Sequence, residues 1–206
     1  MYKIGIDEVG RGALAGPIVV AAVSVPKSFY PRRTTLPKLR DSKKLSAAHR
    51  LLWYEYIKAH PQITYSTARI YPRKIEKLNI ANCANLAAEK VFENLTTKYK
   101  ITVSARNASV FLDGSLYLGK RTAQPRFAKT VTRGDEKFVV IKLASIVAKV
   151  TRDRYMVSLN RKYPQYQFHL HKGYGTLAHR KMLRRFGPAE SHRLTYLKNY
   201  RRVSIV

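Results

Sequence analysis

Four of the twelve acidic residues in this chain of 206 stand where predicted strands end. Asp7 and Glu8 follow the first predicted strand, Asp113 ends a middle strand, and Asp135 lies between a strand and a helix. In an alternating α/β sheet such strand ends can converge at one edge. Carboxylates packed together repel one another and are tolerated chiefly when a divalent cation neutralises them. The four acids therefore predict a site for Mg²⁺ or Mn²⁺, which prefer carboxylate oxygens.

Two such ions about 4 Å apart can activate a water and stabilise the leaving oxygen in an in-line attack on a phosphodiester. Each acid also has a simpler explanation. Asp135 could cap the helix that follows it, Asp113 with Gly114 could form a turn, and Asp7 with Glu8 could pair with basic side chains. Taken one at a time these explanations are as good as the metal site, but all four together favour the metal site.

The net charge points to a polyanionic partner. Lys and Arg total 40 against 12 acids, a net charge of +28, while 45% of residues are hydrophobic, as in globular proteins. A field of this sign attracts nucleic acid. The longest apolar run, residues 18–23, is far shorter than the roughly 20 residues of a membrane span, and the N-terminus lacks the features of a signal peptide. We expect a cytoplasmic protein, monomeric and without a membrane partner, whose single cysteine, Cys83, forms neither a disulfide nor a thiolate metal site.

Strand and helix patterns alternate along the chain, which predicts an α/β fold. Ser46 is a candidate N-cap for a helix that ends near Pro61, and the segment from Tyr163 onward is basic, rich in tyrosine and predicted to form a small helical appendage. The predicted strands are residues 2–6, 17–25, 63–70, 110–112 and 127–132, with the first two forming a hairpin, and the other predicted helices are residues 75–95 and 136 to about 159.

Several segments, in order along the chain, closely resemble motifs of the ribonuclease HII family. The first, IDEVGRG at residues 6–12, is specific by itself. The others are AGPIVVAAV at 15–23, DSKKL at 41–45, LNI at 78–80, LDG at 112–114, GD at 134–135, ASIVAKVTRD at 144–153 and HKGY at 171–174.

This resemblance implies an endoribonuclease that hydrolyses the RNA strand of RNA/DNA hybrids and cuts 5′ of single ribonucleotides embedded in DNA. It implies an RNase H-like fold, a mixed β-sheet flanked by helices, with a catalytic domain at 1–160 and a C-terminal helical substrate-binding segment at 161–206. The family's metal-binding acids carry over onto Asp7, Glu8, Asp113 and Asp135. Two divalent ions, Mg²⁺ or Mn²⁺, would then act in catalysis that leaves a 5′-phosphate and a 3′-hydroxyl.

The segment Gly10-Arg11-Gly12 resembles the part of the family motif that recognises the ribose. Glycines let the backbone approach a sugar closely, and the Arg11 guanidinium can hold a phosphate. Reading RNA against DNA requires contact with a 2′-hydroxyl, which both donates and accepts hydrogen bonds. Tyr174, preceded by Lys172, resembles the family tyrosine that stacks on the deoxyribose after the ribonucleotide.

Further polar and basic residues are candidates for phosphate contact. They are Ser42, Lys43 and Lys44 in one motif and His192 and Arg193 in another. His169, His171 and His179 have irregular spacing and no cysteine partner, which favours phosphate contact or plain surface over a metal site.

Two alternatives stay open at this stage. A non-catalytic basic RNA-binding or ribosome-associated protein would explain the charge but has no use for four acids at strand ends. A different nuclease or transposase on the same fold would share the acids but not Gly10-Arg11-Gly12. The related ribonuclease HIII type carries an extra N-terminal domain and a lysine in this motif, so Arg11 favours type HII.

Overall fold

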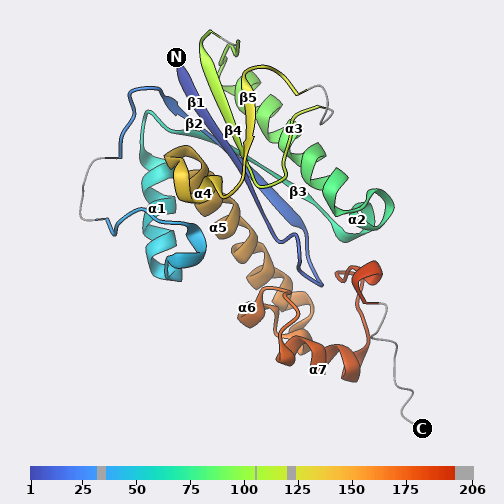
Figure 1. The fold of residues 1–206 in the computed structure, drawn as a ribbon. Helices are drawn as coiled ribbons and strands as arrows, with labels where there is room; N and C mark the ends of the chain where they lie inside the picture. The colour runs from blue at the N-terminus through green and yellow to red at the C-terminus, as the bar shows by residue number, and fades with distance from the viewer. Residues whose placement is uncertain (32–35, 105, 120–123, 198–206) are drawn as a thin grey trace.

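The computed structural model describes residues 1–31, 36–104, 106–119 and 124–197, and its described part contains one five-stranded sheet (Figure 1). The strand order is β3-β2-β1-β4-β5. β1 is antiparallel to β2 and parallel to β4, so the sheet is mixed, as predicted. The strands are β1 (Tyr2–Val9), β2 (Ile18–Pro26), β3 (Thr64–Ile70), β4 (Ala108–Asp113) and β5 (Ala128–Val131).

Helices cover both faces of the sheet (Figure 1). One face packs on α3 (Ile80–Lys98), next to α2 (Pro72–Leu78), and the other packs on α1 (Ala47–Ala59) and α5 (Val139–Lys162). Alternation along β1 decides which side chain meets which helix. Ile4 and Ile6 belong to the α3-side core, whereas Gly5 faces α5 so closely that an added Cβ would lie 2.3 Å from the Val140 carbonyl carbon. Asp7, two residues further on, faces α5 as well.

The first strand is longer than predicted. β1 runs to Val9, so Asp7 and Glu8 lie within it and pair with Ala21 and Val20 of β2, rather than following the strand. Polar residues at the end of an alternating pattern look like a loop in the sequence, but the antiparallel partner extends the pairing.

Two predicted helices are each interrupted. The helix predicted at residues 75–95 is wrong as one element, because Asn79 has φ 61° between α2 and α3 and its side chain accepts a hydrogen bond from the Asn82 amide at 3.0 Å. The helix predicted from residue 136 is divided at Phe138, which is extended and stacks on Phe111 of β4 with centroids 4.2 Å apart. The short helix α4 (Gly134–Lys137) thus precedes α5 and contains Asp135.

The helix after Ser46 is confirmed, since the Ser46 hydroxyl accepts from the His49 amide at 3.1 Å. Leu51 and Leu52 are exposed, while Trp53 and Ile57 enter the core.

The C-terminal segment contains α6 (Phe168–His171) and α7 (Leu177–Phe186) and has a core of its own. Met156 of α5 belongs to that core. The helix α5 also continues through residue 160, where the boundary between the two domains is predicted. The division remains a prediction, and residues 198–206 of the second predicted domain lie outside the described part. None of the helices in the described ranges is long and apolar enough to cross a bilayer.

Candidate active site

The four predicted acids lie at one end of two neighbouring parallel strands. Asp7 and Glu8 are near the end of β1, and Asp113 is the last residue of β4 beside it. The Asp113 carboxylate Oδ1 accepts hydrogen bonds from the Gly134 amide at 2.6 Å and from the Asp135 amide at 3.4 Å. These bonds fasten α4 to the end of β4 and bring Asp135 beside Asp113.

The carboxylates disfavour one another's charge. Burial, followed by the charges of Glu8 and Asp113, raises the pKa of Asp7 well above its usual value, although hydrogen bonds from Ser145 and the Glu8 amide oppose the shift. Burial also raises the pKa of Glu8 against the opposing charge of Arg11. Burial and then the charge of Asp113 raise the pKa of Asp135. Such mutual destabilisation is typical of a site that a cation completes.

One carboxylate oxygen of this group is buried without a partner. Within the described residues Glu8 Oε2 accepts no hydrogen bond, while Oε1 accepts from Arg11 Nε at 2.9 Å. A buried unpaired carboxylate oxygen is costly, and hard divalent cations prefer such oxygens. The donor chemistry therefore fits Mg²⁺ or Mn²⁺. As the side chains stand, no three acidic, histidine or cysteine groups of the described ranges close around one point, so sharing an ion would require rotation of these side chains.

The segment Ser42–Lys44 forms a short 3-10 helix next to the acids. Lys43 Nζ lies 4.0 Å from Asp135 Oδ2, and Lys44 Nζ lies 3.3 Å from Glu136 Oε1. Ser42 differs from the prediction, because its hydroxyl is buried and lies 2.7 Å from the Ser145 hydroxyl. The Lys43 and Lys44 side chains are 80% and 59% exposed, whereas Ser42 supports Ser145, the residue that hydrogen-bonds Asp7.

The glycine motif follows β1 directly. Arg11 is half-buried and held at the acids through its ion pair with Glu8. Gly10 has φ +92°, and an added Cβ would lie 2.2 Å from Arg152 Nε. Around Gly12 an added Cβ would meet nothing within 4 Å. The two glycines thus have different roles. Gly10 makes room for the Arg152 side chain, and Gly12 leaves open space beside Arg11.

Tyr174 also contacts Arg152, the residue that borders Gly10. Its half-buried ring faces the Arg152 guanidinium, 5.1 Å from Cζ to the ring centroid, and Lys149 Nζ at 5.9 Å. Lys172 has φ 53°, and its ammonium group donates to the His169 carbonyl. The structure therefore connects Tyr174 to the glycine motif through one arginine.

His192 and Arg193 are not at the surface, contrary to the prediction of phosphate contact. His192 is 2% exposed and Arg193 is 0% exposed, and both use their side-chain nitrogens on protein atoms. His179 is buried as well and stacks on His171, with centroids 4.3 Å apart. Sequence patterns missed the interior positions because charged and imidazole side chains are usually exposed in so basic a chain.

The buried histidines form a chain of hydrogen bonds with defined tautomers. The Ala189 amide donates to His192 Nδ1 at 2.9 Å, so His192 carries its proton on Nε2 and donates to His179 Nε2 at 3.1 Å. His179 in turn donates from Nδ1 to the Tyr174 carbonyl at 3.0 Å. Both rings are neutral in this arrangement, which joins residue 189 to the backbone of Tyr174.

We expect the C-terminal segment to lose stability in mild acid. Burial lowers the pKa of His179 and of His192 to about 4, against an ordinary value of 6.5. As the pH falls, the unfolded chain binds these protons before the folded protein does. The free energy of unfolding is therefore at its full value above pH 6.5 and decreases by about 2 to 3 kcal/mol per histidine as the pH falls to about 4. Urea unfolding at several pH values measures this slope. His192→Asn removes one titrating histidine and leaves every acid in place, so it should make the dependence of the free energy of unfolding on pH less steep. An unchanged slope would contradict the assignment.

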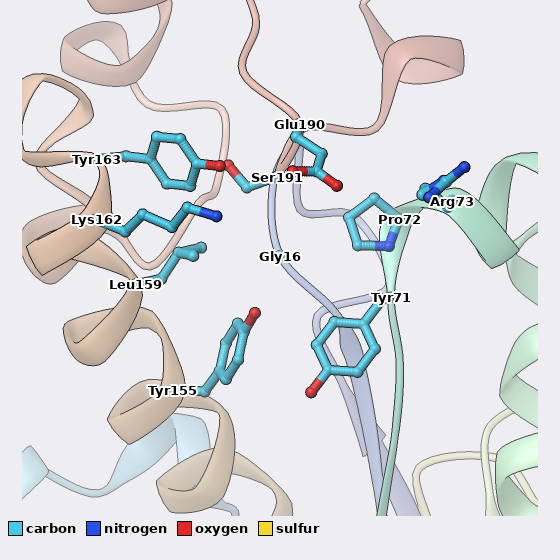
Figure 2. Close-up of a pocket in the computed structure, with 10 residues that line it drawn as sticks. All are labelled: Gly16, Tyr71, Pro72, Arg73, Tyr155, Leu159, Lys162, Tyr163, Glu190 and Ser191. Atoms are coloured by element: carbon cyan, nitrogen blue, oxygen red, sulfur yellow. The ribbon is translucent and has the colours of Figure 1, made fainter.

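A separate pocket of ≈ 300 Å³ lies between α5 and the start of α2 (Figure 2). Tyr71, Tyr155 and Tyr163 line it, and the backbone at Gly16 forms part of its wall (Figure 2). None of the four acids is among its lining residues. This pocket therefore borders the loop between β1 and β2 at Gly16 and is separate from the acids.

A mixed sheet of this order, with acids near the ends of two neighbouring parallel strands, is the arrangement expected of an RNase H-like fold. The sequence model of the family described as Ribonuclease HII matches residues 4–200. Ribonuclease HII of Caldicellulosiruptor bescii is 40% identical over 96% of this chain and 87% of its own length. The chain belongs to the ribonuclease HII family and is a ribonuclease H enzyme, as the sequence motifs predict.

Solved structures agree on the fold. The crystal structure of ribonuclease H2 from Pyrococcus horikoshii OT3 has a TM-score of 0.72 and 21% identity, with 97% of each chain covered. Bst-RNase HIII in complex with Mn²⁺ has a TM-score of 0.71 and 18% identity, covering 97% of this chain and 69% of that one. The RNase H-like fold is thus confirmed.

Proposed function

We propose that this ribonuclease hydrolyses the RNA strand of RNA/DNA hybrids and cuts duplex DNA on the 5′ side of a single embedded ribonucleotide. Family membership supports the first activity. The observation that carries the proposal is the position of Arg11 and Gly12, which follow β1 directly and lie beside the acids. A ribose that contacts this loop would bring its 5′ phosphate to the carboxylates.

We assign metal binding to Asp7, Glu8, Asp113 and Asp135. When bound there, two divalent ions would supply an activated water and stabilisation of the charge on the leaving 3′-oxygen. The unpartnered Glu8 Oε2 and the raised pKa values of Asp7 and Asp135 support this assignment, as does the Mn²⁺ in the related Bst-RNase HIII. The products would be a 5′-phosphate and a 3′-hydroxyl.

The other residues have roles in binding. Arg11 and Gly12 would contact the ribose and its phosphate, and Lys43 and Lys44 would contact the backbone near the acids. Tyr174 would stack on the deoxyribose that follows the ribonucleotide. Lys172 lies beside it and adds positive charge. The 2′-hydroxyl would be recognised and would not act as the nucleophile.

A duplex with one ribonucleotide tests the proposal. With Mg²⁺ or Mn²⁺ we expect one nick 5′ of the ribonucleotide, with a 5′-phosphate and a 3′-hydroxyl at the cut, and with EDTA we expect none. Denaturing gels and end-group analysis give the position and chemistry of the cut. The all-DNA duplex is the control and should stay intact.

Other outcomes favour the competing functions. A cyclic phosphate at the cut would indicate a metal-free ribonuclease, and cleavage of the all-DNA duplex would indicate a different nuclease on this fold. Salt-sensitive binding without any cleavage would indicate a basic RNA-binding protein.

A further inference from the structure

Two buried arginines bind the loop between β1 and β2, residues 10–17, through its carbonyl oxygens. Arg152 of α5 donates from Nε to the Pro17 carbonyl at 3.0 Å and from Nη2 to the Ala15 carbonyl at 3.1 Å. Arg193 donates from Nε and Nη2 to the Gly16 carbonyl at 3.1 and 2.9 Å, and from Nη1 to the Arg11 carbonyl at 2.8 Å. Both side chains are 0% exposed.

Neither arginine has a carboxylate partner among the described residues. A buried charge without a counterion is costly. Burial, with the charge of Arg152 adding to it, lowers the pKa of Arg193 to about 10. An apolar side chain would fill the same volume without this cost, so the guanidinium groups contribute through their fixed pattern of donors. The hydrogen bonds of both guanidinium groups go to carbonyl oxygens of this loop, and the two groups also lie over the rings of Tyr174 and Tyr196, 5.1 and 5.4 Å from Cζ to the ring centroid. Arg152 Nη1 is buried without a hydrogen-bond partner in the described part of the chain.

The backbone of the C-terminal segment binds the same loop from two directions. The Leu14 and Ala15 amides donate to the Gly173 carbonyl at 2.8 and 3.2 Å. The Gly16 amide donates to the Ser191 carbonyl at 2.8 Å. Figure 2 shows the backbone segments that contain Gly16 and Ser191 close to each other. The fit at Gly173 is close, because an added Cβ would lie 2.6 Å from the Ala15 carbonyl oxygen.

We propose that Arg193 and Arg152 are positioning residues for ribonucleotide recognition, and that the C-terminal segment fixes the loop conformation that presents Arg11 and Gly12. The hydrogen bond from Arg193 to the Arg11 carbonyl is the direct connection. This inference depends on the proposed role of Arg11 and Gly12. It assigns the C-terminal segment a second task besides any contact of its own with substrate.

The test compares Arg193→Ala with Arg184→Ala, which removes the same charge from an exposed position on α7. Two quantities are measured for each variant. Hydrogen exchange followed by mass spectrometry reports the protection of residues 10–17. Binding to a duplex with one ribonucleotide and to the matched all-DNA duplex, both in EDTA to prevent cleavage, gives a ratio of dissociation constants.

For Arg193→Ala we expect faster exchange in residues 10–17, unchanged exchange in β1, and a ribonucleotide preference reduced about 10- to 100-fold, because displacing a recognition group by about 1 Å has effects of this size. Binding to all-DNA duplex should change no more than in Arg184→Ala. Added guanidinium ion, which can fill the vacated site, should restore the preference. If Arg193→Ala does not fold, Arg193→Lys keeps the charge with fewer donors and should show the same changes to a smaller extent.

Unchanged protection of residues 10–17 in a folded variant would overturn the proposal. Faster exchange with an unchanged ribonucleotide preference would also overturn it, since the loop would then be held by Arg193 without consequence for recognition. A wild-type protein that does not distinguish the two duplexes would instead refute the proposed function, and the exchange measurement would still decide whether Arg193 holds the loop.

Discussion

Asp7→Asn should abolish cleavage while making the protein more stable. Asp7 is 5% exposed, and burial with the charges of Glu8 and Asp113 raises its pKa well above the usual value. Asparagine keeps the oxygen that accepts from the Glu8 amide at 2.7 Å but removes the negative charge that would hold a divalent ion. Losing several kcal/mol of transition-state stabilisation lowers turnover by about a thousandfold or more.

The same loss of charge that lowers turnover should increase the free energy of unfolding. Burial and neighbouring acids disfavour the charged form of Asp7 in the folded protein, and the unfolded chain does not bear that cost. Removing the charge should therefore raise the free energy of unfolding by on the order of 1 kcal/mol, as at other strained active sites. Urea unfolding without metal measures this change, and single-turnover cleavage with Mn²⁺ measures the loss of activity.

Glu55→Gln is a suitable control for Asp7→Asn. Glu55 lies on α1, where it pairs with Arg154 at 3.1 Å on an exposed face. Its neutralisation removes one acid from the chain and should leave turnover unchanged. Substantial turnover in Asp7→Asn, or reduced hybrid binding by the same factor as cleavage, would contradict the role assigned to Asp7.

The location of the site could be predicted from the sequence because it depends on strand ends. Strands β1 and β4 are parallel neighbours, so the acids near their ends lie close to one another whatever the details of the loops. The local chemistry at Asp113 could not be predicted in the same way. A turn and a metal ligand are equally consistent with Asp-Gly, and only the hydrogen bonds from Gly134 and Asp135 show how this carboxylate also holds α4.

The interior of the C-terminal segment was outside the reach of sequence patterns for a different reason. In a protein with a net charge of +28, Lys, Arg and His are expected at the surface. Arg193 and His192 are buried nonetheless, because the loop 10–17 offers carbonyl oxygens that no regular element satisfies and because His179 provides a matching acceptor. Such pairings join residues more than 170 positions apart in the case of Arg193 and Gly16, and neither strand nor helix periodicity records them.

The two glycines that flank Arg11 should respond to alanine in opposite ways. At Gly10 an alanine would have both φ +92° and a Cβ 2.2 Å from Arg152 Nε, so Gly10→Ala should lower the free energy of unfolding by about 2 to 5 kcal/mol. At Gly12 the Cβ meets nothing within 4 Å, and Gly12→Ala should change stability by less than about 0.5 kcal/mol. The added methyl group would instead occupy the space beside Arg11 where the ribose is proposed to lie, so cleavage 5′ of a ribonucleotide should fall at least about tenfold.

Unfolding and cleavage measured on both variants separate packing from recognition. The result expected is an unstable Gly10→Ala protein and a stable, poorly active Gly12→Ala protein. Full activity in Gly12→Ala would mean that the open space at this residue does not receive the sugar. A Gly10→Ala protein as stable as the wild type would mean that Arg152 can move away from the loop at little cost, which would weaken its assignment as a positioning residue.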